Sequence, residues 1–407
     1  MRIIEIALTG TVGTGRMGPV STDICELSNR FAARGHEVVV VDVPAEERRS
    51  LLRPGIRLIE VPGVPQGRVA AETRSRLAAQ IQRWRNYYRC MSGLQSRLDL
   101  TRADIVHFHA PEPAFLAQRL YGLDAVTYTA HTPTWSLVPP ARRSVIGRIM
   151  MRLEQSVIRR SCVSVGLGDY LAAAVPGANV VTIPNGLDFD AWPMIDRADA
   201  RRVLGFGKDE FVVLFAGRIN PVKGIDTLLQ AVEELAPVMP HLRTCIIGPL
   251  SGAFDTRDEY VDAYAQQMLV RAQGLPVRFL GFISNRTLEF RQYLAAADVF
   301  VLPSRSEAQG LVVLEALAMG TPVIGSATGG IPDMVTDEVG DLFPRGNAAA
   351  LAACIRMAHD NPERLQAKRL AARARVLRHY SWDGVADSYL AAFDRCACSR
   401  TLLLKAA

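Results

Sequence analysis

The chain has 407 residues, of which 49% are hydrophobic and 22% are charged. This composition is that of a soluble globular protein, and the length exceeds what one ordinary core requires, so we expect two domains. The formal net charge is +6, but no aromatic-interleaved basic face or DNA-binding motif indicates nucleic acid as a partner. No segment is long and apolar enough to span a membrane.

The chain start and the cysteines indicate a cellular compartment. Met1 leads directly into a predicted strand, so we expect no signal peptide and a cytoplasmic protein. The seven cysteines are scattered without a CxxC pair, which predicts neither a zinc site nor a disulfide framework.

The first elements predict a βαβ unit. A strand at Arg2–Leu8 precedes a glycine-rich loop, Thr9–Pro19, a helix at Ser21–Ala33 and a strand at Glu37–Val43. Glycines at the first turn are typical of the phosphate-binding side of a doubly wound sheet. They match GxGxxG only loosely. Because Asp42 ends the second strand, a Rossmann dehydrogenase stays an alternative for this half.

Two helices of the first half are predicted to be rich in arginine, Ala71–Leu98 and Ser144–Arg160. One interpretation is a pair of surface helices with their apolar faces on the core. The other is interfacial helices on anionic lipid, for which arginine flanks and a Trp are typical. The apolar stripe predicted for the first helix consists of Leu77, Ile81, Trp84, Tyr88 and Met91.

Two histidines follow predicted strands. Asp104–Phe108 precedes His109, and Ala125–Ala130 precedes His131. Ligands bind at the carboxyl ends of strands in open α/β sheets, so we interpret both histidines as binding residues. No carboxylate nucleophile is predicted beside them. The other strands expected in this sheet are Ile56–Val61, Cys162–Val165 and Val180–Ile183.

A linker without periodicity, Pro184–Pro193, separates the two halves. Its Asp188-x-Asp190 motif is interpreted as a turn and not as a metal-binding DxD. Alternating strands and helices resume after it. The strands are Arg243–Ile247, Val277–Leu280, Val299–Leu302 and Pro322–Gly325, and the helices are Asp258–Ala272, Arg286–Ala296, Leu311–Ala318, Ala348–His359 and Pro362–His379.

One βα junction of the second half has the residues of an anion site. A buried strand, Phe211–Ala216, is followed by Gly217, Arg218, Lys223 and a helix at Ile225–Leu235. A helix N-terminus offers free N–H groups and partial positive charge, to which two cations add full charges. This junction predicts a phosphate site; an ordinary turn with two solvated cations is the alternative.

Two acids follow another strand of the same half. Glu307 lies in a predicted loop, and Glu315 lies inside an otherwise apolar helix, where a carboxylate is costly unless it is used. Carboxylates facing hydroxyls suit a sugar and a ribose; two solvated surface acids are the alternative. Backbone N–H groups between the two acids belong to Gln309, Gly310 and Leu311.

With these residues in hand, the chain resembles the family 4 retaining glycosyltransferases of GT-B fold over nearly its whole length. The best-matching segments are GRINPVKGIDTLLQA, ADVFVLPSRSEAQGLVVLEALAMGTPVIGSATGGIPDMV, ANVVTIPNGLD and RGHEV. The resemblance implies an α/β fold of two Rossmann-like doubly wound domains facing a central cleft. Residues 1–187 would form the acceptor-side domain and 188–380 the nucleotide-sugar-binding domain, with a helix at 381–398 packing back on the first.

The resemblance also implies a role for each matching residue of the second domain. Arg218 and Lys223 would grip the diphosphate of a nucleotide-sugar donor. Glu315 would bind the ribose, and Glu307 would contact the donor sugar with the backbone of the residues that follow it. The remaining donor-binding residues are Gly217, Gln309, Gly310, Leu311 and, near the base, Phe282.

In the first domain, His131 resembles the family histidine that faces the donor sugar near its reacting carbon, and His109 is placed on the acceptor side. The glycine-rich loop matches a family Gly-Gly turn that meets donor phosphate or acceptor, at Gly18. The second glycine is Pro19 here, which lacks an N–H and fixes φ. Earlier glycines such as Gly15 compensate for it.

The function implied is retaining transfer of a sugar, from a UDP-sugar as the commonest donor, to an acceptor hydroxyl. Neither metal nor cofactor is expected. The acceptor stays open among a sugar, a lipid and a small metabolite, and peripheral contact with anionic membrane is a further expectation. A GT-B-like nucleotide-sugar epimerase and a non-catalytic partner subunit of a glycosyltransferase are the alternatives.

Overall fold

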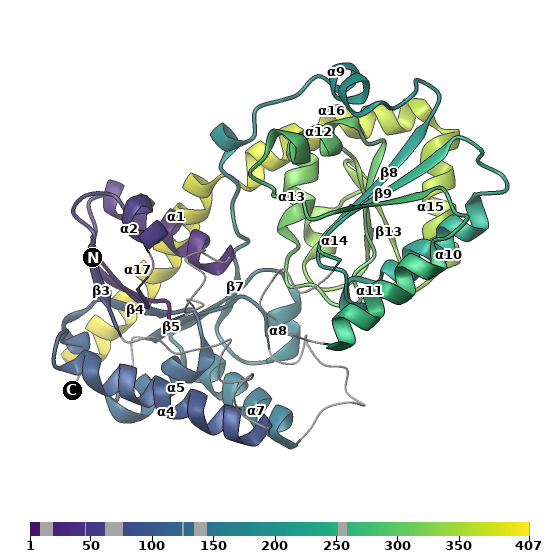
Figure 1. Cartoon of the computed structure of the whole chain (residues 1–407). Helices are drawn as coiled ribbons and strands as arrows, with labels where there is room; N and C mark the ends of the chain where they lie inside the picture. The colour runs from purple at the N-terminus through teal and green to yellow at the C-terminus, as the bar shows by residue number, and fades with distance from the viewer. Residues whose placement is uncertain are drawn as a thin grey trace. The chain divides into compact units, whose positions relative to one another are not determined.

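A computed structural model of the chain describes residues 1–8, 19–44, 46–61, 76–123, 126–133, 145–250 and 259–406. The chain divides into two compact units. Unit 1 comprises Met1–Gly186 and Trp382–Ala407, and unit 2 comprises Leu187–Ser381. Each unit has a parallel sheet of its own with helices packed on it (Figure 1).

The sheet of unit 1 has the strand order β3-β2-β1-β4-β5-β6-β7, and all its neighbouring strands are parallel. Its central strands are buried on both faces, so they do not alternate between buried and exposed residues. The strands are β1 Arg2–Ile6, β2 Glu37–Asp42, β3 Arg57–Glu60, β4 Ile105–Phe108, β5 Val126–Ala130, β6 Val163–Gly166 and β7 Val180–Thr182.

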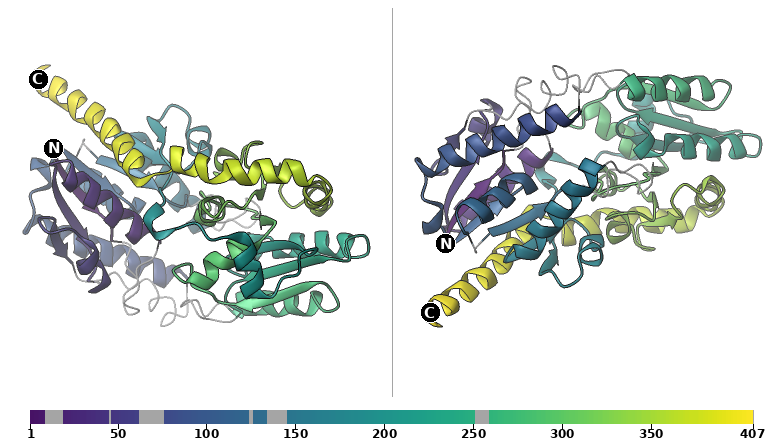
Figure 2. Two further views of the ribbon diagram at one scale, coloured as in Figure 1. Left: turned by 90° about the horizontal axis from the view of Figure 1, so that it is seen from above. Right: turned by 90° about the horizontal axis from the view of Figure 1, so that it is seen from below.

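Two helix layers cover this sheet, and successive residues of β1 face opposite layers. Ile4 and Ile6 pack with α4, α5 and α7, whereas Ile3 and Ala7 pack with α1 and α17. Figure 2 shows the molecule from above and from below. The helices are α1 Pro19–Ala33, α2 Glu46–Leu51, η1 Leu100–Arg102, α4 Arg76–Gln95, α5 Pro111–Leu120, α7 Val145–Arg160, α8 Tyr170–Ala174 and α17 Trp382–Ala406.

The C-terminal helix α17 belongs to unit 1, although it follows unit 2 in the chain. It contacts α1, β4 and β6, and Tyr389 and Phe393 are buried in the same core as Phe31 of α1. Cys396 forms a disulfide with Cys162, which directly precedes β6. The expectation of no disulfide is therefore wrong here, because two cysteines 234 residues apart give no spacing signal.

The buried face of α4 differs from the predicted stripe. Tyr87 and Met91 are buried, but Ile81 and Tyr88 are 45% and 52% exposed. Both tyrosines have helical spacing from Trp84, so periodicity alone does not choose between them. Arg83 lies over the Tyr87 ring at 5.6 Å from its centroid. None of the described helices is long and apolar enough to cross a membrane.

The sheet of unit 2 is also parallel, in the order β10-β9-β8-β11-β12-β13. The sequence does not predict β13, whose short run includes Gly and Asp. The strands are β8 Phe211–Ala216, β9 Leu242–Ile247, β10 Val277–Gly281, β11 Val299–Leu302, β12 Val323–Ser326 and β13 Gly340–Phe343.

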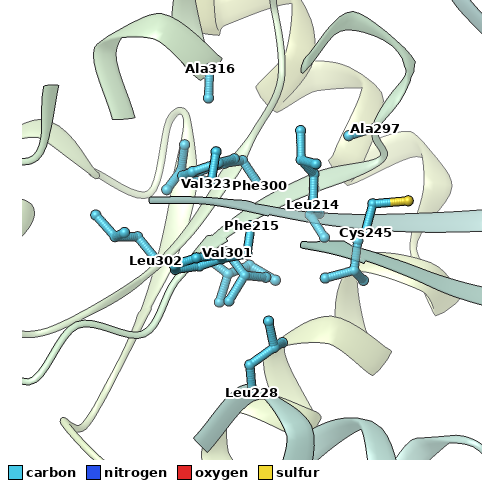
Figure 3. Packing of buried hydrophobic residues seen from close by; sticks show 14 of the residues in the cluster. Leu214, Phe215, Leu228, Cys245, Ala297, Phe300, Val301, Leu302, Ala316 and Val323 are labelled. Carbon is cyan, nitrogen blue, oxygen red and sulfur yellow. The ribbon is translucent and has the colours of Figure 1, made fainter. Parts of the chain in front are cut away.

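One hydrophobic core holds unit 2 together. Leu214 and Phe215 of β8, Leu228 of α10 and Phe300 of β11 belong to it (Figure 3). Asp188 caps a short turn by accepting from the N–H of Asp190, so this DxD is a turn as predicted. The helices are η3 Phe189–Ala191, α9 Arg197–Leu204, η4 Pro221–Lys223, α10 Ile225–Leu235, α11 Glu259–Arg271, α12 Leu288–Ala296, α13 Leu311–Ala318, α14 Ile331–Met334, α15 Ala348–Asp360 and α16 Pro362–His379.

Strand order in both sheets reverses direction at one point. The reversal lies between β1 and β4 in unit 1 and between β8 and β11 in unit 2. Successive crossovers leave in opposite directions from such a point, so a crevice forms at the carboxyl ends of its two strands. The chain therefore places the segments after β8 and β11 where a ligand of unit 2 is expected.

We predict that Cys396→Ser lowers the free energy of unfolding by about 2–4 kcal/mol, because the cross-link restricts the unfolded chain. Urea denaturation with and without dithiothreitol measures the effect. Wild-type protein should lose stability on reduction, whereas the variant should not respond. Cys354→Ser, which removes a free cysteine, is the matched control and should keep the wild-type response. Equal midpoints for oxidised and reduced wild type would contradict this prediction.

Candidate active site

The loop after β8 is held in a fixed shape by its own side chains. Gly217 directly follows β8, and the side chain of Asn220 accepts from the backbone N–H of Lys223 at 3.2 Å. Gly224 follows with a φ of +66°, and a Cβ there would lie 2.1 Å from the carbonyl oxygen of Pro303. Only glycine fits this position, so the loop after β8 lies directly against the end of β11.

The two cations of this loop differ in whether an acid compensates their charge. The Lys223 ammonium donates to Oε2 of Glu307 at 2.5 Å, and both side chains are largely buried. Ser304 Oγ donates to the same carboxylate oxygen at 3.1 Å. Arg218 is exposed and makes no salt bridge with any acid in the described part of the chain. One positive charge is therefore compensated and the other is uncompensated.

Backbone contacts support the loop that carries Glu307. Gly329 packs so closely that a Cβ would lie 1.6 Å from the Glu307 carbonyl oxygen, and its φ is +55°. Ser326 Oγ donates to the Ser304 carbonyl at 2.6 Å. The backbone N–H of Arg305 donates to the Val222 carbonyl at 2.7 Å, which ties this loop to the one after β8.

The second acid, Glu315, lies within α13 and is only 8% exposed. Asn285 donates its side-chain N–H to Oε1 of Glu315 at 2.7 Å. Burial raises the pKa of Glu315 to about 7, although the Asn285 hydrogen bond opposes this shift. Gly310 is the N-cap of α13 with a φ of +89°, and Gln309 before it is buried. The helix N-terminus and the acid therefore belong to one short segment.

The structure brings some of the predicted donor residues together. Lys223 and Glu307 are in contact, as described above, and Leu311 begins α13. Phe282 follows β10 and is 49% exposed. Gly15 and Gly18 lie outside the described residues. Asn285 was not predicted; its place shortly after Phe282, in the segment that the resemblance assigns to the base, was the available signal.

In unit 1, His109 and His131 are in direct contact. Nδ1 of His109 lies 2.9 Å from Nε2 of His131, and both residues are buried. Nε2 of His109 forms a hydrogen bond of 2.7 Å with Oε2 of Glu5. His107 Nδ1 lies 2.9 Å from the same oxygen. The residues come from the neighbouring strands β1, β4 and β5 and the segments that follow them.

Two carboxylates that the sequence did not indicate lie beside these histidines. Glu5 contacts two of them, and Oδ2 of Asp23 lies 4.0 Å from Nδ1 of His131. Glu5 was missed because it lies inside the strand RIIEI, and a charged residue among buried isoleucines was the available signal. Both acids are almost completely buried.

Burial and mutual contact set the charges of this cluster. Burial alone would raise the pKa of Glu5, but the charges and hydrogen bonds of His107 and His109 outweigh it and lower the pKa to about 2. Burial lowers the pKa of His109 to about 4 and that of His131 well below its usual value. Glu5 is therefore ionised, and His109 and His131 are neutral, near pH 7.

Glu5, His107 and His109 are also the group of described residues close enough to hold a metal ion, with ligand atoms within 4.8 Å of one another. A metal ligand must be a bare nitrogen, whereas His109 bonds to the carboxylate at a hydrogen-bond distance. We therefore interpret the group as a hydrogen-bonded cluster and assign no ligand.

Each of the two units matches a known protein family. The family described as Glycosyl transferases group 1 matches residues 196–376, and that described as Glycosyltransferase Family 4 matches residues 20–191. A D-inositol 3-phosphate glycosyltransferase of Actinosynnema mirum is 31% identical, over 94% of this chain and 93% of that protein.

Two solved structures share the fold. Sucrose-phosphate synthase from Thermosynechococcus elongatus has a TM-score of 0.76 at 21% identity, covering 98% of this chain and 100% of that one. Anabaena Alr3699/HepE, solved in complex with UDP and glucose, has a TM-score of 0.70 at 18% identity, covering 97% and 99%. The fold is thus that of the GT-B glycosyltransferases. The chain belongs to glycosyltransferase family 4, the group 1 glycosyltransferases, and is a glycosyltransferase.

We predict that Glu315→Gln gains stability relative to wild type as pH rises from about 4.5 to 7. The folded protein binds the Glu315 proton more tightly than the unfolded chain, since the pKa rises from 4.5 to about 7. Wild type therefore loses up to about 3 kcal/mol across this window, and glutamine does not titrate. Urea denaturation at pH 5 and pH 8 measures the difference.

The matched control for this prediction is Glu289→Gln, which changes an exposed glutamate on α12. Its stability relative to wild type should be the same at both pH values. A Glu315→Gln variant that tracks wild type at both pH values would show that the buried carboxyl is not destabilised on ionisation.

Proposed function

We propose that this glycosyltransferase moves a sugar from a UDP-sugar to an acceptor hydroxyl with retention of anomeric configuration. The observation that carries the proposal is the contact of Lys223 with Glu307 at the carboxyl ends of β8 and β11. The other cation of the loop after β8, Arg218, is exposed and pairs with no acid in the described part of the chain. Solved neighbours of the same fold hold UDP or UDP-glucose, which supports a UDP-sugar as donor. The relatives' name makes D-inositol 3-phosphate the first acceptor to assay.

The two cations have different tasks in this proposal. Arg218 meets the diphosphate first, because it pairs with no acid within the described ranges of the chain. In the ligand-free protein, Lys223 is held by its contact with Glu307. When hydroxyls of the donor sugar bind the Glu307 carboxylate, the Lys223 ammonium turns to the phosphate. As the sugar–phosphate bond breaks, negative charge grows on the diphosphate, and both cations with the α10 and α13 N-termini stabilise it.

The ribose hydroxyls are assigned to Glu315. Its carboxylate accepts hydrogen bonds best when ionised, which needs a pH above its pKa of about 7. A bound ribose would donate to the carboxylate and so offset part of the cost of burying its charge. Donor binding is therefore coupled to ionisation of this acid.

Retention without a covalent intermediate is supported by the acids of unit 1. Glu5 is fully buried and engaged with His107 and His109, so it cannot attack a sugar. Burial raises the pKa of Asp23, and a protonated carboxyl is a poor nucleophile. A front-face path, in which a leaving phosphate oxygen accepts the proton of the acceptor, needs neither acid. Proton NMR of the product, showing a retained or inverted anomeric centre, tests it.

We predict that Arg218→Ala and Lys223→Ala each lower turnover about 100-fold or more, or roughly 3 kcal/mol of transition-state stabilisation, with folding intact. The measurement is kcat and KM for UDP-sugar turnover, with melting temperature as the folding check. Lys208→Ala, which removes an exposed lysine of the same unit, is the control and should be neutral. Near-normal turnover in both site variants would remove the diphosphate assignment.

A donor screen identifies the base and the sugar. A ligand that binds the folded state raises the melting temperature by mass action. We expect UDP and at least one UDP-sugar to raise it, and ADP- and GDP-sugars to raise it less. A larger shift with a guanosine or adenosine nucleotide would overturn the uridine preference. An epimer formed from donor alone would instead favour the epimerase alternative.

We also predict that turnover persists in excess EDTA, because two cations and two helix N-termini replace the charge that a Mg²⁺ ion supplies in other transferases. Assays in EDTA, and after returning Mg²⁺, measure this. A complete loss that Mg²⁺ reverses would count against the proposed charge compensation.

Peripheral membrane contact is proposed for the surface of α7. Val145 and Ile149 of this helix are 62% and 58% exposed, and Arg148 and Arg152 beside them are exposed as well. Exposed aliphatic side chains next to arginines suit the boundary of an anionic bilayer.

Co-sedimentation with phosphatidylglycerol vesicles is therefore expected, and none with phosphatidylcholine alone. Ile149→Glu should weaken binding roughly tenfold, since it removes one inserted side chain. Val203→Glu, at a 57% exposed position on α9, is the control and should bind like wild type. Binding that is independent of lipid charge, or unaffected by Ile149→Glu, would rule out this surface.

A further inference from the structure

A chain of hydrogen bonds in unit 1 ends at His131 and begins at a carboxylate that no solvent reaches. Glu5 Oε2 lies 2.7 Å from Nε2 of His109, and Nδ1 of His109 lies 2.9 Å from Nε2 of His131. The rings of the two histidines are stacked, with centroids 5.2 Å apart. Glu5 is 0% exposed, and His109 is 5% exposed. His131, at 9%, is the most exposed of the three residues.

The proton positions in this chain follow from the chemistry of each atom. An ionised carboxylate only accepts, so Nε2 of His109 must carry a proton and donate it to Glu5. A neutral imidazole has one proton, which leaves Nδ1 of His109 bare and able only to accept. Nε2 of His131 must then donate to it, and Nδ1 of His131 is bare. The lowered pKa of both histidines agrees with their neutral form.

The bare Nδ1 of His131 has an unsatisfied neighbour. This nitrogen and Oδ2 of Asp23 are both buried without a hydrogen-bond partner among the described residues, and they lie 4.0 Å apart. An oxygen atom about 2.8 Å from each would hydrogen-bond to both, because 4.0 Å separates them. Burial raises the pKa of Asp23, so its carboxyl can donate while His131 accepts. A hydroxyl, which both donates and accepts, can satisfy this pair.

We propose that Glu5 and His109 are positioning residues that hold His131 in its Nε2–H form, so that its Nδ1 and Asp23 together bind one hydroxyl of a sugar. The identification of that hydroxyl as a sugar's rests on the proposed function. The relay of hydrogen bonds from Glu5 through His109 to His131 does not rest on the proposed function, because it follows from contacts within unit 1. This changes the expected role of His109: both its ring nitrogens are engaged within the protein, so it acts through His131.

His107 supplies an internal control. It lies 2.9 Å from the same oxygen of Glu5, and its Nε2 contacts Thr129 Oγ1 at 2.8 Å, which in turn contacts the Tyr389 hydroxyl at 3.1 Å. It makes no hydrogen bond with His131 in the described structure. His107→Phe therefore disturbs the same buried carboxylate without interrupting the path to His131.

The test is a long-range proton–nitrogen NMR correlation of the imidazole rings in protein labelled with ¹⁵N-histidine. The chain has seven histidines, and the signal lost in His131→Gln assigns His131. We expect a protonated Nε2 and a bare Nδ1 for His131 in the ligand-free wild type. In Glu5→Leu, Nε2 of His109 faces a hydrocarbon and loses its proton to Nδ1, so His131 should switch completely to its Nδ1–H form. His107→Phe should keep the wild-type form.

The outcomes distinguish a failure of the relay from a failure of the proposed UDP-sugar donor. A His131 ring protonated on Nδ1, or on both nitrogens, in the wild type overturns the relay even if Glu5→Leu fails to fold. An unchanged form in folded Glu5→Leu overturns it as well. Adding UDP-glucose should move the Nδ1 resonance, whereas UDP alone should not; equal shifts with both would overturn the hydroxyl site. A melting temperature that neither ligand raises contradicts the UDP-sugar donor and leaves the ligand-free spectrum to decide the relay.

Discussion

The ion pair between Lys223 and Glu307 joins the loops that follow the two central strands of unit 2. Each loop alone is an ordinary βα connection. Together they place a cation, a carboxylate and two helix N-termini at the point where strand order reverses. The pair also holds the Lys223 ammonium against the loop that carries Glu307. Arg218 of the same loop makes no salt bridge with an acid among the residues that the structure describes, and the proposed anion site rests on this uncompensated charge.

At the carboxyl edge of its sheet, unit 1 has a buried polar cluster in place of the charged loops of unit 2. Its polar residues are turned inward and contact one another: Oε2 of Glu5 accepts from His109 and lies 2.9 Å from Nδ1 of His107. A buried carboxylate is costly unless it is hydrogen-bonded, and the histidine contacts provide this. The cluster includes Tyr389 of α17 through Thr129. The C-terminal helix therefore completes a polar network as well as a hydrophobic core.

The local features of both units could be predicted, but the long-range pairings could not. Arg218, Lys223, Glu307 and Glu315 were found because each lies within a few residues of a strand or helix whose pattern is clear. Glu5 and His109 are 104 residues apart, and only the order of strands, which the sequence leaves open, makes them neighbours. The same holds for Asn285 with Glu315 and for the disulfide. Whether Tyr87 or Tyr88 is buried depends on one residue of helix rotation, and periodicity does not resolve that difference.

Glu315 shows why such pairings matter for function. The sequence marks it as an acid in an apolar helix, but only the structure shows that it is almost fully buried and that Asn285 donates to it. With a pKa of about 7, the carboxyl is balanced between a neutral form that suits the empty protein and a charged form that suits a ligand with hydroxyl donors. A ligand that donates to it shifts this balance toward the charged form, because it binds that form more tightly. Such a ligand would therefore recover part of the stability lost by burying this acid.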